Sequence, residues 1–290
     1  GECLFALHGH TKPVCSLSWS EDGQLISGSW DSTVRKWDIK TGKSTLTLGG
    51  FENAVVVLGL PNGDIATGSS GKAENGMHVG YKLRIYRGEQ LVCEQEDHGS
   101  AIRQLALVPG VGFASASNDG SVIIRSVDGT ALSRLSAGDS FVLGLCVLPT
   151  GEIAAASDDG VVNVWKDGRI VQSIAHPSSI WCVAALPNGD LATGASDKVV
   201  RIFSRSPQRI ADPGTIEAYA TSVQATRLRQ AARSGSRIDP STLAKYEDRF
   251  SLPGKHDGQI TMFNNGGKPF VYRWEGASSM WVEVGEAMGS

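Results

Sequence analysis

The sequence lacks the features that mark membrane proteins, nucleic-acid-binding proteins and disulfide-rich secreted proteins. Its longest uninterrupted apolar run, AVVVLGL, is far too short to span a bilayer, and its beginning, GECLFALHGH, is not that of a signal peptide. A net charge of −3 attracts neither nucleic acid nor an anionic membrane. The five cysteines form no C-x-x-C pair, which suits a reducing compartment. These absences predict a cytoplasmic and nuclear protein.

What the sequence does contain is an internal repeat. Five segments superpose when each is aligned on the first apolar residue of its opening strand, namely Val14, Ala54, Ile102, Val142 and Ile180. In four of them an aspartate follows 17 residues later, at Asp31, Asp119, Asp159 and Asp197. Runs rich in Val, Ile and Ala alternate with turn signals such as PNGD and DDG, which predicts a small antiparallel sheet in each segment. A repeat of about 40 residues is typical of a propeller blade.

Histidine, serine or threonine, and aspartate recur at the same positions and could be mistaken for a hydrolase triad. The three sets are His10, Ser27 and Asp31; His98, Ser115 and Asp119; and His176, Thr193 and Asp197. A hydrolase needs one nucleophile and one base in one pocket, whereas a repeat fold needs the same buried network in each unit. We interpret the sets as structural tetrads, completed by Trp37 in the first segment. Outside them we find no catalytic set, metal site or cofactor motif, which predicts a protein that is not an enzyme.

These residues, with GH at 9–10 and WD at 37–38, resemble the WD-repeat family. The resemblance implies an all-β propeller over residues 1–205, with five blades visible where the family usually has seven, and CLFAL (3–7) closing the last blade as its fourth strand. Arg125 and Phe203 stand at the tryptophan position of the third and fifth segments. The second segment has Gly71 at the acidic position and carries an insertion before Tyr86, which is either a ligand loop or a disordered decoration.

The composition changes after the propeller. Residues 206–249 read as a linker with a possible helix. In residues 250–290, QITMF and PFVYRW flank NNGG and are followed by MWVEVGEAM, which predicts a hairpin and a third strand. The PGK and DGQ motifs, the NGGK turn and the terminal VGE and MGS resemble the start of the PFU module, the ubiquitin-binding domain of the phospholipase A-2-activating protein family. A propeller, a linker and this module are that family's order of parts.

The resemblance implies a non-catalytic adaptor that binds ubiquitin or ubiquitin chains and serves ubiquitin homeostasis and proteasomal degradation. For the full-length parent it also implies an AAA+ unfoldase as a partner, bound by a C-terminal helical domain that this sequence does not contain. Against the family pattern the chain looks truncated at its N-terminus, and only the beginning of the PFU module is expected. Within it Phe270, Tyr272 and Trp274 alternate onto one face of a strand, which favours packing of the small sheet over ubiquitin contact.

On the top face of a WD-repeat propeller, exposed positions adjoin the start of each opening strand and the turn aspartate. From these positions we predict a ubiquitin-binding set of Trp30, Arg103, Phe141, Asp158 and Trp181, because interface hot spots are enriched in aromatic residues and arginine. Phe141 and Trp181 could instead wedge between blades. The alternative function is a general WD-repeat scaffold that holds a peptide motif or a partner subunit and does not bind ubiquitin.

Overall fold

The structure is a computed structural model, and it describes residues 3–74, 77–206, 211, 213–233, 260–265, 268–275 and 280–286. The chain divides into two compact units, Gly1–Arg209 and Ile210–Ser290. The first unit contains the repeated segments and is built of strands.

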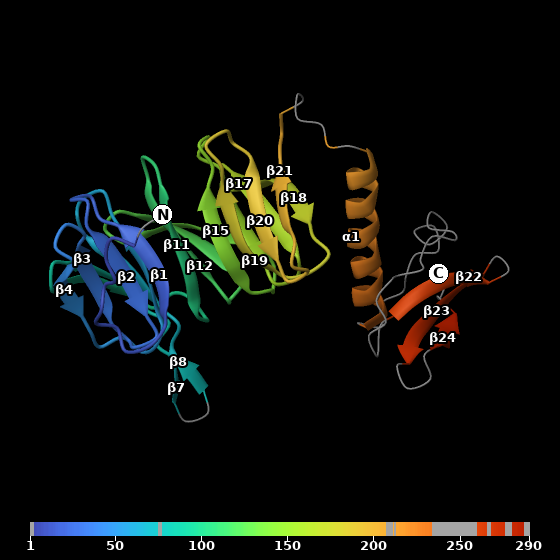
Figure 1. Ribbon diagram of the computed structural model, residues 1–290, viewed down its shortest axis with the longest axis horizontal. Coiled ribbons are helices and arrows are strands. Elements are labelled where there is room, and N and C mark those ends of the chain that lie inside the picture. Colours follow the sequence, from blue (N-terminus) through green and yellow to red (C-terminus); the bar gives the residue numbers. More distant parts are fainter. Residues whose placement is uncertain are drawn as a thin grey trace. The chain divides into compact units, whose positions relative to one another are not determined.

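Five antiparallel sheets form the first unit, one for each repeated segment (Figure 1). The first sheet consists of β1 (Val14–Trp19), β2 (Leu25–Ser29), β3 (Val34–Asp38) and β4 (Lys43–Leu48). The second consists of β5 (Val55–Gly59), β6 (Ile65–Ser69), β9 (Leu83–Arg87) and β10 (Gln90–Gln95). The third consists of β11 (Ile102–Val108), β12 (Gly112–Ser117), β13 (Ser121–Ser126) and β14 (Ala131–Ser136). The fourth consists of β15 (Val142–Val147), β16 (Ile153–Ser157), β17 (Val161–Lys166) and β18 (Arg169–Ala175), and the fifth of β19 (Ile180–Ala185), β20 (Leu191–Ala195) and β21 (Val200–Phe203).

The turns that join the first two strands of a sheet form where the sequence has PNGD or PTGE. Their glycines have left-handed backbone conformations, with φ of 83° at Gly63, 83° at Gly151 and 85° at Gly189. Glycine adopts such angles without the steric penalty that a Cβ atom brings. The local sequence therefore fixes the hairpins from which each sheet is built.

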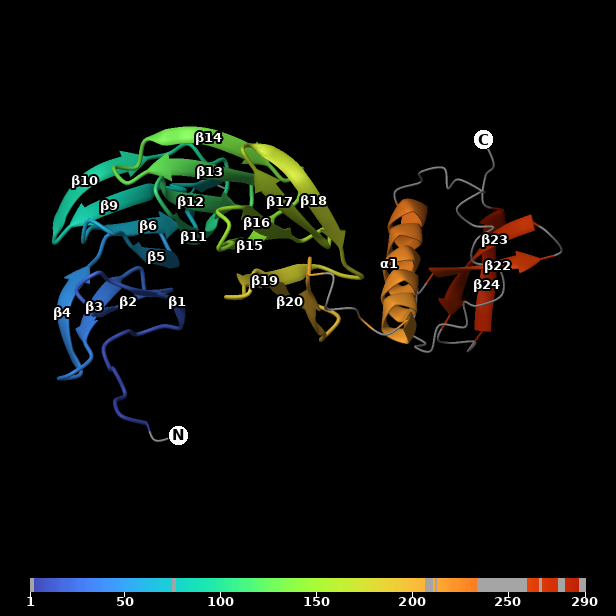
Figure 2. The same cartoon turned by 90° about the horizontal axis from the view of Figure 1, so that it is seen from above.

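The sheets stand side by side in an arc, with the opening strands β1, β5, β11, β15 and β19 on its inner side (Figure 2). The apolar core lies between neighbouring sheets. Between the first and second, Ile26 and Val34 pack against Val55 and Val57, and all four are almost completely buried. This arrangement of sheets as blades confirms the predicted all-β WD-repeat propeller.

Neighbouring blades approach closely at their inner strands. Ser16 Oγ accepts a hydrogen bond from the Val57 N–H at 3.0 Å, which links β1 to β5. A Cβ atom on Gly28 would lie 2.1 Å from the Val55 carbonyl oxygen. Only glycine fits at this position, because the backbone of the next blade occupies the space of a side chain.

The expected closure of the last blade by CLFAL is wrong. Residues 3–7 form no strand, and β21 has no fourth-strand partner among the described residues. Phe5 lies against the turn between β3 and β4, where a Cβ atom on Gly42 would come within 3.2 Å of its ring. Strand exchange requires the first and last blades to be neighbours, and Figure 2 shows the arc open between β1 and β19.

The second unit contains α1 (Pro213–Arg233), which falls in the segment read as a linker, and a three-stranded antiparallel sheet. The sheet consists of β22 (Ile260–Asn265), β23 (Lys268–Glu275) and β24 (Met280–Glu286). The predicted hairpin and third strand are therefore present. The two turn glycines, the PGK and DGQ motifs, and residues 287–290 lie outside the described residues.

Candidate functional site

The first tetrad is a continuous chain of hydrogen bonds. Trp37 Nε1 donates to Ser27 Oγ at 2.8 Å, and His10 Nε2 lies 2.7 Å from the same oxygen. On its other side, His10 Nδ1 lies 2.9 Å from Asp31 Oδ2. Ser27 is only 3% exposed, so no substrate reaches it. The set ties β2 and β3 to the segment that enters the blade.

Asp31 is held as a carboxylate in this network. Burial alone would raise its pKa, but hydrogen bonds from the Thr33 hydroxyl, the Thr11 N–H and His10 outweigh burial and hold the pKa well below its usual range. The charged form therefore stabilises the fold, since it accepts hydrogen bonds from the Thr33 hydroxyl and from the Thr11 and Thr33 N–H groups.

In the third blade an arginine replaces the tryptophan of the tetrad. His98 lies 2.9 Å from Ser115 Oγ and 3.0 Å from Asp119 Oδ2, as in the first blade. Arg125 Nε donates to Ser115 Oγ at 3.1 Å, at the place of the indole N–H. Its two terminal nitrogens bind the Asp97 carboxylate at 2.9 and 2.7 Å. The guanidinium is completely buried, so it depends on Asp97 for charge balance.

In the fifth blade, the set of His176, Thr193 and Asp197 forms only in part. This corrects the expectation that it makes a tetrad like those of the first and third blades. His176 Nε2 lies 2.8 Å from Thr193 Oγ1, and the ring of Phe203 stands 5.1 Å from the imidazole. Asp197, however, pairs with Arg201 at 2.7 Å. The guanidinium attracts the carboxylate because it carries a full charge, whereas burial lowers the pKa of His176 and favours its neutral form.

Within the insertion of the second blade, β7 (Lys72–Glu74) and β8 (Met77–Val79) pair as a two-stranded antiparallel ribbon. It starts after Gly71, whose φ is 72° and where a Cβ atom would lie 2.5 Å from the Tyr81 ring. A glycine thus stands where other blades have aspartate because Tyr81 fills the space beside it.

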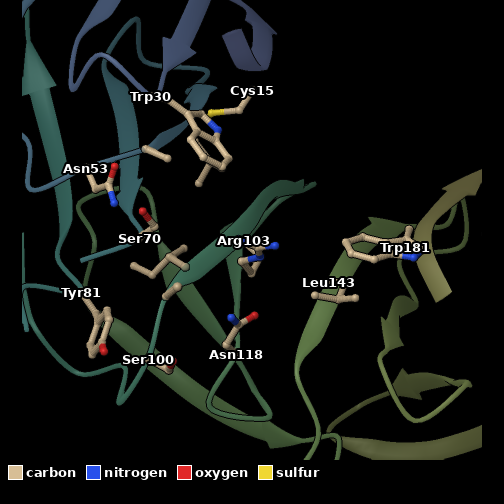
Figure 3. A pocket seen from close by; sticks show the side chains of 14 residues that line it. Cys15, Trp30, Asn53, Ser70, Tyr81, Ser100, Arg103, Asn118, Leu143 and Trp181 are labelled. Carbon is tan, nitrogen blue, oxygen red and sulfur yellow. The ribbon is translucent and has the colours of Figure 1, made fainter. Parts of the chain in front are cut away.

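A pocket of about 640 Å³ opens among the first residues of the opening strands (Figure 3). Each of the five blades contributes to its lining, which includes Cys15, Trp30, Tyr81, Arg103, Leu143 and Trp181. Most of these side chains are apolar or aromatic, and one carries a charge. Such a lining is typical of a site for binding.

β-Bulges place four of the lining residues. In four blades, the opening strand has one residue that is left out of its pairing with the second strand. The strands concerned are β1, β11, β15 and β19, and the unpaired residues are, in the same order, Cys15, Arg103, Leu143 and Trp181. A bulge leaves one residue out of the ladder and re-aims its side chain. The same irregularity therefore presents one side chain to the pocket from each of these blades.

The opening strand of the second blade, β5, has no bulge, and this corrects the alignment of its segment. Val55 and Val56 pair in unbroken register, so the blade is one residue shorter at this point, and Val55 rather than Ala54 is the counterpart of Val14. Ala54, Val56 and Ser70 also line the pocket, although they are not among the predicted site residues. Ser70 precedes Gly71 by one residue, as Trp30 precedes Asp31, so it could have been predicted from its position in the repeat.

Three of the five predicted ubiquitin-binding residues come together. Trp30, Arg103 and Trp181 line the pocket, whereas Phe141 and Asp158 do not. Trp30, Phe141 and Trp181 are 53%, 50% and 58% exposed, so none is wedged between blades in this structure.

The thiol of Cys15, which lines the pocket, is not activated as a nucleophile. The Cys15 Sγ donates to the carbonyl oxygens of Gly28 and Val55 at 3.5 and 3.4 Å. Burial of the sulfur atom raises the pKa of the thiol, so the unreactive protonated form dominates. Trp181 is fixed by a hydrogen bond from its Nε1 to Ser196 Oγ at 2.7 Å.

In the part of the chain that the structure describes, no three His, Cys, Asp or Glu side chains are grouped as a metal ion requires. No helix in the described ranges is long and apolar enough to cross a membrane.

Comparison with known proteins gives concordant similarities. The family of the WD domain, G-beta repeat, matches residues 1–38, 129–166 and 168–204. The ubiquitin homeostasis protein lub1 of Schizosaccharomyces pombe is 32% identical over 98% of this chain, and the phospholipase A-2-activating protein of Xenopus laevis is 31% identical over 41%. The chain spans 38% of the first relative and 15% of the second. The crystal structure of the WD40 β-propeller domain of Doa1 superposes with a TM-score of 0.63 and 31% identity, over 73% of this chain and 70% of that one.

Proposed function

This chain belongs to the WD40-repeat β-propeller family that includes the Doa1 propeller, and on that premise we propose that it is a non-catalytic adaptor that binds ubiquitin or ubiquitin chains. It acts in ubiquitin homeostasis and in ubiquitin-dependent, proteasomal degradation, in the cytoplasm and nucleus. The similarity to the ubiquitin homeostasis protein lub1 supports this pathway.

The observation that carries the proposal is the aromatic pocket. Trp30 and Trp181 come from the first and fifth blades, and both are more than half exposed while lining one concave surface. Exposed indoles in such a setting are typical of interface hot spots. They suit the apolar surface that ubiquitin presents to its receptors.

A pocket of this size supports a small, transient contact. We expect a binding free energy of about −6 kcal/mol, which corresponds to a dissociation constant of tens of micromolar. A complete PFU module would supply a second ubiquitin site, and two linked sites increase avidity along a ubiquitin chain. Binding to an AAA+ unfoldase is proposed only for the full-length parent.

The test is an NMR titration of ¹⁵N-labelled ubiquitin with the unlabelled chain. Wild type should shift resonances of the apolar surface of ubiquitin, and Trp30→Ala should weaken these shifts several-fold. Trp19→Ala is the matched control, because Trp19 is also exposed, at 58%, and lies outside the pocket. It should leave the titration unchanged.

The titration also separates the adaptor from a general WD-repeat scaffold. A scaffold that holds another peptide or subunit gives no ubiquitin shifts even at high micromolar protein. If Trp30→Ala and Trp19→Ala weaken the ubiquitin shifts equally, the pocket is not the binding site, since the loss would then not depend on a residue that lines it.

A further inference from the structure

Arg103 is the only charged side chain in the lining of the pocket, and its guanidinium has no partner among the described residues. Arg84 and Arg125, by contrast, bind the carboxylates of Glu52 and Asp97. A guanidinium offers a planar set of donors that matches a carboxylate. The pocket thus presents an unused donor set for an anion.

Arg103 is accessible to a ligand from solution. Figure 3 shows its side chain between the Trp30 and Trp181 sides of the pocket. The residue is exposed, and its charge acts across the pocket on the Cys15 thiol of the first blade. An anion that pairs with Arg103 therefore lies beside the two indoles.

A second unsatisfied group lies next to it. The Asn118 N–H donates to the Ala101 carbonyl oxygen at 2.9 Å, which places Asn118 beside the start of β11. Its side chain lines the pocket, and its Oδ1 has no hydrogen-bond partner among the described residues. The oxygen itself is buried, so a bound peptide interacts with this side chain through the amide NH₂, which donates to a peptide carbonyl oxygen.

We propose that the pocket binds an extended peptide that carries a carboxylate next to an apolar side chain. The carboxylate pairs with Arg103, a peptide group hydrogen-bonds to the Asn118 amide, and the apolar side chain contacts Trp30 and Trp181. The lining offers one cation, which balances a carboxylate and leaves the second charge of a phosphate unmatched. This proposal does not depend on ubiquitin binding.

Three heptapeptides labelled with an uncharged BODIPY dye test it by fluorescence anisotropy with the full chain. The first has glutamate between two leucines and an amidated C-terminus. The second has glutamine in place of the glutamate, and the third is the second with a free C-terminal carboxylate. At least one carboxylate peptide should bind about tenfold more tightly than the neutral one, because a charge-assisted hydrogen bond is lost in the latter.

Arg103→Gln should reduce binding of the carboxylate peptide to that of the neutral peptide and leave the neutral peptide unaffected. Arg169→Gln, which changes an exposed arginine of β18 outside the pocket, is the control and should change nothing. If only the third peptide binds more tightly than the neutral peptide, the site recognises the carboxylate of a chain end. If only the first does, the site recognises an acidic side chain. Either result supports the proposal.

Three results would overturn it: equal affinity for all three peptides, an equal loss for all three in Arg103→Gln, or no binding of any peptide at millimolar protein. Titration of labelled ubiquitin with the same samples distinguishes the two proposals. Ubiquitin shifts without peptide binding would reject the carboxylate site and leave the adaptor function standing.

Discussion

Removing Asp97 should destabilise the propeller strongly, because Arg125 would keep a buried charge without its partner. The Asp97 carboxylate accepts two hydrogen bonds from this guanidinium, and the arginine side chain is 0% exposed. Loss of one member of a buried pair costs about 3–5 kcal/mol. Asp97 is itself 30% exposed, so water replaces part of the lost interaction, and we expect about 2–3 kcal/mol for Asp97→Ala.

The first blade indicates how this loss can be repaired. There Trp37 Nε1 donates to Ser27 Oγ, as Arg125 Nε donates to Ser115 Oγ in the third blade. Adding Arg125→Trp to Asp97→Ala removes the unpaired charge and supplies an indole N–H for the serine. We expect the double variant to lie within about 1 kcal/mol of wild type, since an apolar replacement of a buried pair is often neutral.

Urea unfolding followed by circular dichroism measures the free energy of unfolding of wild type, Asp97→Ala, Arg125→Trp and the double variant. Asp139→Ala, at an exposed position before β15, is the control for loss of a carboxylate. The reasoning fails if Asp97→Ala unfolds at the same urea concentration as wild type. It also fails if the double variant is no more stable than Asp97→Ala.

Three further outcomes are expected. Ser27→Ala should lower the free energy of unfolding by about 1–3 kcal/mol, measured in urea, because the buried Trp37 N–H loses its acceptor; an unchanged midpoint contradicts this. Gly28→Ala should lower the melting temperature by several degrees, since its Cβ atom would lie 2.1 Å from the Val55 carbonyl oxygen. A melting curve like that of wild type would contradict this, because it would mean that the two blades move apart without loss of stability. Asp31 has a folded-state pKa below its ordinary value of 3.8, so the unfolded chain binds more protons, and the stabilisation present above that pH should fall as the pH is lowered through it. Urea midpoints between pH 7 and pH 3 check the sign, and Asp31→Asn should flatten the dependence.

The blades and two of their tetrads could be predicted because they follow from spacing alone. Once His10, Ser27 and Asp31 recur at constant offsets in other segments, the same turns and strand register must bring each set together. The fold class rests on the same regularity. Residues that repeat at a fixed period can be assigned a structural role without information on long-range contacts.

The remaining features depend on contacts that the spacing does not contain. Asp197 keeps its position in the repeat, yet Arg201 takes its carboxylate, and only the folded blade reveals this competition. The absence of a bulge in β5 shifts one segment by a residue and hid the contribution of Val56 to the pocket. The CLFAL segment could close a blade only if the first and last blades were adjacent.

The bulge residues separate recognition from folding. Because the residues at positions 15, 103, 143 and 181 stand outside the pairing ladder, an exchange of side chain there leaves strand register unchanged. Cysteine, arginine, leucine and tryptophan already occupy equivalent places on one framework. These places act as variable positions on a constant scaffold, so relatives of identical architecture can diverge in their ligands through four substitutions, and a combinatorial library at the same four positions is a direct route to propellers of new specificity.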